Sequence, residues 1–386
     1  MMKRGRSVLC VIAVVLTAWV AGAAADIAVL DGSGTAGPAN NHLWLYNDDG
    51  TPKNIFSGSN QVDAPASVSW YDTAMLSNGD VIAVGFFNQM VTIFDGSDGS
   101  VKLTATGHGQ YYKVTGLPNG GFAVGVRNYN DGVNAYNSPL LFYDAPTFDG
   151  SDWVLADPTV LDLSATTNNN INFWLPSSNN SADLTLAGGQ AGAADPLVAV
   201  MSWNTSNSKV VQYYNKAGLQ GSIDQDGTRG DAGCYGITAD ASADDASTVH
   251  QAGALWPGNS DFDTLVDGTP DAETRYNFPA GGSNDYAWLD VTVMPGDPAT
   301  LLAIDSRGSD EGRGGDDIYK ITLVDPVAPA TVGTVTIEQF FDAPKDFYYA
   351  SGYVRIDTYV IPEPATMVLL GVGSAGMLLA RRRRRS

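Results

Sequence analysis

The sequence predicts an all-β fold built from repeated four-stranded units. Short apolar or alternating runs are separated by Asn-Gly and Asp-Gly turns, which is typical of strands joined by tight hairpins. The same turn sequence recurs at an equivalent place in two successive units, and a strand near the C-terminus supplies what the first unit lacks. Abundant Asp, Gly, Asn, Ser and Thr also favour turns between strands over long helices.

Two units show the repeat most clearly. The first has predicted strands at 72–76, 81–85, 91–94 and 101–105, and the second at 112–117, 122–126, 140–143 and 153–156. Leu76-Ser77-Asn78-Gly79 and Leu117-Pro118-Asn119-Gly120 lie about 41 residues apart, each between the first two strands of its unit. This spacing indicates a repeat in which each small sheet needs neighbours to bury its faces.

The remaining units are weaker or incomplete. Predicted strands follow at 197–203, 210–214, 235–239 and 253–256, and a clearer unit has strands at 288–294, 301–304, 318–323 and 335–341. The opening unit offers only three strands, at 27–30, 43–46 and 53–56.

A C-terminal strand at 353–359 is predicted to complete the opening unit. Asp342-Ala343-Pro344 and the aromatics that follow it mirror Asp63-Ala64-Pro65 and its following Trp70-Tyr71. A last strand that pairs with the first sheet closes a ring and removes its edges. The body therefore resembles a β-propeller, of the NHL or SMP-30 kind, with about six four-stranded blades closed by a C-terminal strand. A pair of β-sandwiches or jelly rolls remains the alternative.

The first 25 residues predict a secretory signal helix. Basic residues at Lys3, Arg4 and Arg6 precede an apolar run at 8–20, and three alanines end at Ala25. This order is typical of a segment that signal peptidase removes, which makes Asp26 the expected mature N-terminus.

The last 25 residues predict a membrane helix with a cytoplasmic stop. The order is Pro362, Glu363 and Pro364, an uncharged stretch at 365–380, and the arginines Arg381, Arg382, Arg383, Arg384 and Arg385. The stretch would reach about 24 Å as a helix, and arginine side chains can extend to the interface. These three parts resemble the PEP-CTERM sorting domain, also labelled ice-binding protein C-terminal domain. The resemblance implies recognition and cutting by an exosortase-type enzyme, so that the membrane anchor is transient.

The sequence thus divides into a signal peptide at 1–25, an extracellular domain at 26–361 and a sorting tail at 362–386. Thirteen of the 21 Lys and Arg and 41 of the 42 Asp and Glu lie in the middle region, which gives it a formal charge of −28. Such a charge excludes nucleic acid as a partner, because binding phosphates needs a basic footprint.

Recognised catalytic motifs are absent from the sequence. It has no Gly-x-Ser-x-Gly, phosphate-binding loop or Cys-x-x-Cys, and His42, His108 and His250 lie far apart. We therefore predict no catalytic residues and no cofactor, although converging Asp pairs cannot be assigned from sequence. Calcium binding stays open at Asp224, Asp226 and Asp231, which place hard oxygens on a tight turn.

These features predict an exported protein of the cell surface or extracellular matrix. Its body is expected to be a non-enzymatic binding or structural module, with extracellular polysaccharide as one candidate partner. The alternative is a secreted propeller hydrolase or lyase that acts on polysaccharide. Tryptophans on or beside predicted strands are expected to be core residues before they serve for sugar stacking; they are Trp44, Trp70, Trp174, Trp203 and Trp288.

Overall fold

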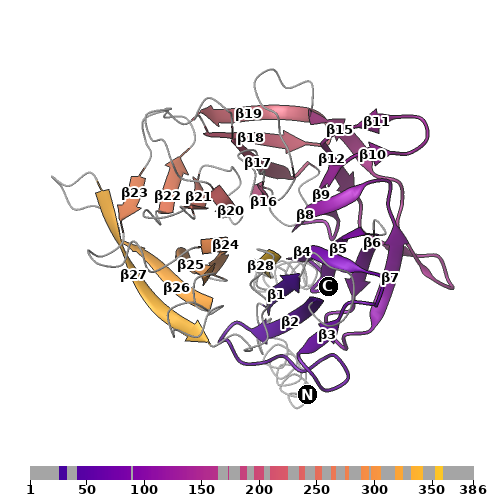
Figure 1. Ribbon diagram of the computed structural model, residues 1–386, viewed down its shortest axis with the longest axis horizontal. Coiled ribbons are helices and arrows are strands. Elements are labelled where there is room, and N and C mark those ends of the chain that lie inside the picture. Colours follow the sequence, from indigo (N-terminus) through magenta and orange to yellow (C-terminus); the bar gives the residue numbers. More distant parts are fainter. Residues whose placement is uncertain are drawn as a thin grey trace, which may run out of the picture. The chain divides into compact units, whose positions relative to one another are not determined.

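A computed structural model describes sixteen stretches of the chain. They are residues 26–32, 41–87, 90–163, 173, 183–188, 195–203, 209–224, 234–239, 248–253, 262–266, 274–277, 288–294, 297–305, 318–324, 332–341 and 353–359. The regular elements in these stretches are β-strands (Figure 1). None of the described residues forms a helix with the length and hydropathy needed to span a bilayer.

Four sheets of the body contain four antiparallel strands each. In the order of their hydrogen bonding they are β28 (Tyr353–Tyr359), β1 (Asp26–Gly32), β2 (Asn41–Asn47) and β3 (Gln61–Asp63); β4 (Ser69–Met75), β5 (Val81–Phe87), β6 (Met90–Phe94) and β7 (Val101–Thr106); β8 (Gln110–Gly116), β9 (Phe122–Arg127), β12 (Pro139–Tyr143) and β15 (Thr159–Asp162); and β16 (Asp183–Gly188), β17 (Leu197–Trp203), β18 (Lys209–Asn215) and β19 (Gly218–Asp224).

A fifth sheet contains eight strands. They are β20 (Cys234–Ala239), β21 (Thr248–Gly253), β22 (Phe262–Val266), β23 (Thr274–Asn277), β27 (Val332–Phe341), β26 (Ile318–Val324), β25 (Asp297–Asp305) and β24 (Trp288–Met294). Its two halves are antiparallel, and they join where β23 pairs in parallel with β27.

The inner strands of these sheets form a closed ring. β28 contacts β4, β4 contacts β8, β8 contacts β16, β16 contacts β20, β20 contacts β24, and β24 contacts β28 (Figure 1). The predicted β-propeller fold is confirmed by this arrangement. The predicted closure is also confirmed, because β28 pairs with β1 along seven residues from Asp26–Tyr359 to Gly32–Tyr353.

The predicted blade number is corrected. In the described part of the chain the ring contains five sheets, where the sequence predicts about six separate blades. The physical reason is the β23–β27 pairing, which joins two four-stranded units along their outer strands into one hydrogen-bonded sheet.

Two predicted strands lie elsewhere. The third strand of the opening sheet is Gln61–Asp63, whereas the predicted segment 53–56 forms no strand and has one isolated bridge, between Phe56 and Ser59. The predicted strand 153–156 is not the fourth strand of its unit; that strand is β15, and Trp153–Val154 is β14, which pairs with β13 (Thr147–Phe148) in a separate hairpin. A second inserted hairpin joins β10 (Tyr129–Asn130) to β11 (Ala135–Tyr136).

The two Asn-Gly turns have the same geometry, which confirms the repeat. Gly79 and Gly120 have φ values of 85° and 81°, a left-handed conformation that glycine adopts without steric cost. In each turn the glycine N–H donates to the carbonyl oxygen of the leucine three residues earlier, Leu76 or Leu117. The Asn side chain accepts from the backbone N–H two residues on, at Asp80 or Gly121.

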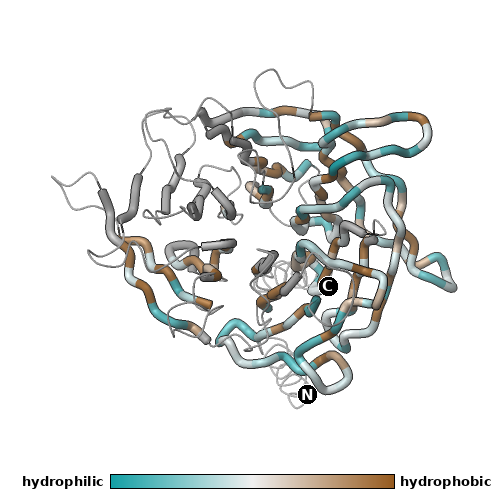
Figure 2. Tube along the Cα trace, viewed as in Figure 1, coloured by the Kyte–Doolittle hydropathy of each residue, from teal (hydrophilic) through white to brown (hydrophobic). Residues whose placement is uncertain are grey.

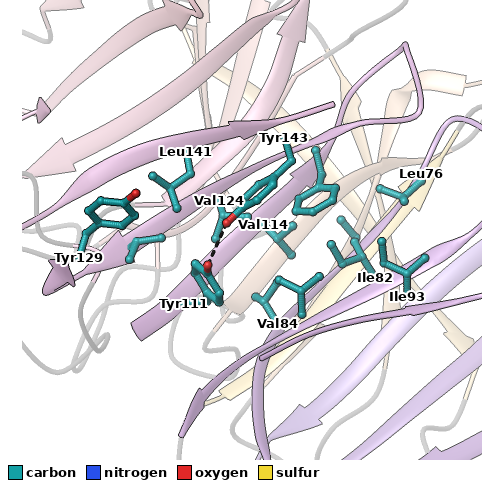
Figure 3. Packing of buried hydrophobic residues seen from close by; sticks show 14 residues of the cluster. Leu76, Ile82, Val84, Ile93, Tyr111, Val114, Val124, Tyr129, Leu141 and Tyr143 are labelled. Atoms are coloured by element: carbon teal, nitrogen blue, oxygen red, sulfur yellow. Dashed lines mark hydrogen bonds between the residues drawn. The ribbon is translucent and has the colours of Figure 1, made fainter. Parts of the chain in front are cut away.

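The core lies between neighbouring sheets. Brown, apolar segments alternate with teal ones along the strands (Figure 2). Figure 3 shows the cluster between the sheets of β4–β7 and β8–β15, where Ile82, Val84 and Ile93 pack with Val114, Val124 and Leu141. Within this cluster the Tyr111 and Tyr143 hydroxyls are 2.9 Å apart and form a hydrogen bond. The bond gives each buried hydroxyl a partner, as buried polar atoms require. Trp44 and Trp70 are buried, as predicted; the side chains of the other three tryptophans lie outside the described residues.

Removing the closing strand is expected to open the ring. Deletion of 352–360 should expose the edge of β1 and cause aggregation out of proportion to nine residues, because unpaired edges template intermolecular pairing. Size-exclusion chromatography and thermal unfolding measure this. A matched control replaces 131–134, the tip of the β10–β11 hairpin outside the ring sheets, with a Gly-Ser segment of equal length. A deletion variant that stays monomeric and melts like the parent would show that β28 does not close the body.

Candidate functional site

The inner strands place one set of side chains at equivalent positions around the ring axis. β4, β8, β20 and β24 each contain a β-bulge, and the residue after it is Asp72, Lys113, Gly236 or Asp290. A bulge re-aims the side chain next to it and twists the strand. The same local irregularity therefore presents two carboxylates and one ammonium group from three different strands.

Two of these carboxylates bind the backbone of the next inner strand. Asp72 Oδ2 accepts a hydrogen bond from the Val114 N–H at 2.8 Å, and Asp290 Oδ2 accepts one from the Ile356 N–H at 2.9 Å. Asp72 and Asp290 are both buried. A charged acceptor forms a stronger hydrogen bond than a neutral one, so each carboxylate fastens one sheet to its neighbour.

Three further junctions use other side chains: Thr115 and Thr238, each two positions after the residue that follows the bulge, and Asp357 of β28. Thr115 Oγ1 accepts from the Leu186 N–H at 3.0 Å, and Thr238 Oγ1 accepts from the Val293 N–H at 3.1 Å. Asp357 Oδ2 accepts from the Met75 N–H at 2.8 Å. Five junctions of the ring thus share one device: a side chain of one inner strand accepts from a backbone N–H of the next.

Lys113 makes a buried ion pair across the junction of β8 and β16. Its Nζ lies 2.8 Å from Asp183 Oδ1, and both residues are buried. β8 also approaches β4 closely, since a Cβ at Gly116 of β8 would lie 2.2 Å from the carbonyl oxygen of Met75 in β4. Only glycine permits this approach of two backbones.

The acids converge on one small cavity at the axis. Its lining includes Asp72, Asp183, Asp290 and Asp357, with threonines Thr73, Thr115, Thr185, Thr238 and Thr292. The cavity has a volume of about 20 Å³. This is enough for a single water molecule, which needs roughly 10–15 Å³, and far below the roughly 300–1,000 Å³ of pockets that hold drug-sized ligands.

The pKa of Asp357 is shifted by its surroundings in this cavity. Burial raises its pKa well above the ordinary 3.8, and the nearby carboxylates of Asp72 and Asp290 raise it further by like-charge repulsion. The Met75 N–H opposes both effects by favouring the charged form. The carboxyl group thus keeps its proton to a higher pH than an exposed aspartate, and its remaining carbonyl oxygen can still accept from Met75.

Surface aspartates show the opposite behaviour. Hydrogen bonds from Ser97 and from Lys102 lower the pKa of Asp95 to about 2, and hydrogen bonds from Asn134 and Val133 lower the pKa of Asp131 to about 2. These residues shape turns, as the sequence predicts for most acids of the body.

The residues predicted as sites lie mostly outside the described chain. Ala25, Pro362, Glu363, Pro364 and Arg381–Arg385 fall there, as do the calcium candidates Asp226 and Asp231 and the side chain of Asp224. Asp26 is described: it is the first residue of β1, is buried, and forms an ion pair with Lys53. Among the described residues, no group of three or more His, Cys, Asp or Glu is arranged to hold a metal ion.

The sequence by itself does not predict which side chains lie together at the ring axis. A detectable signal did exist, because Trp70-x-Asp72 and Trp288-x-Asp290 place a carboxylate inside an otherwise apolar strand. Buried acids are rare unless they are paired or hydrogen bonded, so such a position predicts a specific partner. The three histidines lie in different places. His42 Nδ1 of β2 lies 2.8 Å from Asp63 Oδ1 of the neighbouring strand β3. His108 is exposed, and His250 lies in β21 with its side chain outside the described residues.

Comparison with known proteins identifies the tail. The PEP-CTERM protein-sorting motif matches residues 360–385, which begin directly after β28. This motif implies export, a C-terminal membrane-anchoring tail and processing by an exosortase-type enzyme. No curated protein matches the sequence.

Several solved structures are similar in fold. They include a chain of a nidogen/laminin complex (TM-score 0.47, 9% identity, 87% of this chain and 99% of that chain), a protein of unknown function from Bacteroides caccae (0.45, 11%, 87% and 99%) and the β-propeller domain of Cps50 (Swd1) from Myceliophteria thermophila (0.42, 9%, 88% and 98%). With TM-scores below 0.5, these similarities carry no argument about ligand or activity.

Truncating Asp72 tests the axial hydrogen bonds. Asp72→Ala leaves the Val114 N–H without its acceptor and should lower the free energy of unfolding by about 1–3 kcal/mol. Asp72→Asn keeps an acceptor oxygen and should cost clearly less. Urea unfolding followed by tryptophan fluorescence measures both, with the exposed Asp48→Ala as control, expected within about 0.5 kcal/mol of the parent. Equal stability of Asp72→Ala and Asp48→Ala would contradict the role given to Asp72.

The raised pKa of Asp357 predicts a pH dependence of stability. The folded state holds the proton of Asp357 more tightly than the unfolded state does. Protonated Asp357 therefore makes its full contribution to the free energy of unfolding below the pKa of the unfolded state, near 4. It is lost as pH rises through the raised pKa of the folded state. Asp357→Asn cannot ionise, yet it retains an acceptor for Met75.

The variant should therefore gain stability relative to the parent as pH increases from about 4 to 8. Comparing the two proteins cancels the contributions of the surface aspartates, which titrate in both. Urea midpoints measured across this range test the prediction, and a stability difference that does not change with pH would refute it.

Proposed function

We propose that this protein is exported, sorted through its PEP-CTERM tail, and acts at the cell surface or in the extracellular matrix as a non-enzymatic binding or structural module. The observation that carries the proposal is the direct continuation of the closing strand into the tail. β28 ends at Tyr359 and the sorting motif begins at residue 360, so the propeller itself is the cargo that the tail delivers. Signal peptidase and the exosortase-type enzyme are its processing partners.

The fate of the axial acids supports a non-enzymatic body. Catalysis on glycans needs an acid and a base or nucleophile that can reach the substrate. Asp72, Asp290 and Asp357 instead accept backbone hydrogen bonds between strands, and Asp183 is paired with Lys113. Among the described residues the cavity beside them has a volume of about 20 Å³, the size of a site for one water molecule.

One observation favours the alternative, a propeller hydrolase or lyase acting on polysaccharide. Four carboxyl groups meet at one place, and burial beside Asp72 and Asp290 raises the pKa of Asp357, as acid–base pairs require of one of their members. Structural networks perturb pKa values in the same way, and here each acid already has a structural partner. We therefore place the hydrolase second.

Processing at both ends is the first expected outcome. Mass spectrometry of the surface fraction should find Asp26 as the N-terminus and no Arg381–Arg385 segment, in a host that has the sorting enzyme. Replacing Pro362, Glu363 and Pro364 by alanines should leave the arginine segment attached while the body still folds. Intact arginine ends on most surface molecules of the parent protein would contradict sorting through the tail.

Absence of turnover is the second expected outcome. The purified exported protein should leave a broad panel of polysaccharides uncut at all pH values from 4 to 9, when reducing ends and unsaturated products are measured. Turnover that survives purification and disappears in both Asp290→Asn and Asp357→Asn, with folding intact, would establish the hydrolase or lyase instead.

A further inference from the structure

The β13–β14 hairpin is an addition to the ring. It is inserted between β12 and β15, which pair directly with each other, so their sheet is complete without it. β14 contacts β7 of the neighbouring sheet. A surface segment that the scaffold does not need is a place where function is often found.

This hairpin and β7 expose apolar side chains. Phe148 on β13 is 56% exposed, Val154 on β14 is 43% exposed, and Val101 on β7 is 58% exposed. Phe148 pairs across the hairpin with Trp153, and their ring centroids are 5.7 Å apart. Of the large apolar side chains that the described residues expose, Phe148 is the one with an aromatic ring.

The hairpin holds these rings in a fixed geometry. Asp149 Oδ1 accepts hydrogen bonds from the Ser151 N–H, the Asp152 N–H and the Ser151 hydroxyl, which closes the turn. Lys102 packs over the ring of Trp153, with its Nζ 5.0 Å from the ring centroid. A ligand would therefore meet preformed rings and lose little conformational freedom on their side.

The charges around the rings disfavour anionic ligands. Lys102, the cation at this surface, already pairs with Asp80 at 2.7 Å and Asp95 at 3.0 Å. The exposed tip adds the carboxylates of Asp149 and Asp152, and the whole body carries −28. An anionic polymer would be repelled here. A neutral polyhydroxylated ligand fits, because its C–H faces suit aromatic rings and its hydroxyls can donate to the carboxylate of Asp152.

We propose that the exposed face of Phe148, with Trp153 and the Ser151–Asp152 turn, binds neutral polysaccharide by stacking against a sugar ring. The inference rests on the proposed function, since it names the ligand class and the site of the binding module. The tryptophans of the core are not involved.

The test measures binding of the purified exported protein to neutral dextran and a soluble neutral β-glucan by affinity electrophoresis. Alginate and polylysine serve as anionic and cationic probes. Phe148→Ala should weaken neutral-glycan binding about tenfold, the size expected for one lost aromatic contact of about 1.4 kcal/mol. Phe148→Tyr should retain it, and binding should change little between low and high salt. Leu219→Ala is the matched control, because Leu219 is also an exposed apolar residue of a strand, 48% exposed on β19.

Retention of binding by Leu219→Ala with loss in Phe148→Ala supports the site. If the parent binds neutral glycan and Phe148→Ala binds equally well, the site is wrong while the proposed binding function stands. Salt-sensitive binding to polylysine that depends on Phe148 would overturn the ligand class. If the parent binds none of the neutral glycans, the neutral ligand class is refuted, and if it does not bind alginate either, polysaccharide binding by the body is refuted with it.

Discussion

Each inner strand has one edge that pairs within its own sheet and a second edge that faces the next inner strand of the ring. In a β-sheet such an edge leaves backbone N–H groups that must find acceptors once they are buried. Asp72, Asp290, Thr115, Thr238 and Asp357 supply those acceptors from the preceding strand. The constraint to satisfy these N–H groups determines which residues can stand at the axis.

The same constraint explains why carboxylates converge at the axis without forming a substrate pocket. Each acid is held by a backbone donor or by Lys113, and threonines fill the space between them. Like charges in a small cavity repel, and retention of a proton by Asp357 relieves part of that repulsion. The axis is thus a polar core that fastens the sheets, and the surface hairpins are left to carry recognition.

The sequence predicts the fold well where turn chemistry is strict. The paired Asn-Gly turns ending at Gly79 and Gly120 and the closing strand at 353–359 needed only local residues and the logic of ring closure. The predicted strand at 53–56 is wrong because the two apolar residues Ile55 and Phe56 pack against the core without pairing along β2, whereas Gln61–Asp63 does pair with β2. Residues 153–156 were misassigned because an inserted hairpin has the same alternating pattern as a strand of the ring. The count of separate sheets depended on β23–β27 pairing between segments far apart in the sequence, which no local pattern encodes.

The candidate site was less predictable. The order of Pro362, Glu363, Pro364 and the terminal arginines predicted the sorting motif, because an enzyme reads that tail as a linear segment. The partners of the axial acids depend on which strands become neighbours in the ring, so the sequence around Asp72 does not show that Val114 lies beside it. A charged residue within an apolar strand was the available clue at Asp72, Lys113 and Asp290.

Amide hydrogen exchange of the inner strands under native conditions tests most directly whether axial side chains hold the sheets together. If side chains at the axis satisfy the ring-facing edges, the N–H groups of Met75, Val114, Leu186, Val293 and Ile356 should exchange as slowly as the ladder amides of the same strands. Exchange of these five amides at the rate of exposed turn residues, while the ladder amides stay protected, would contradict the claim that these hydrogen bonds hold the sheets together.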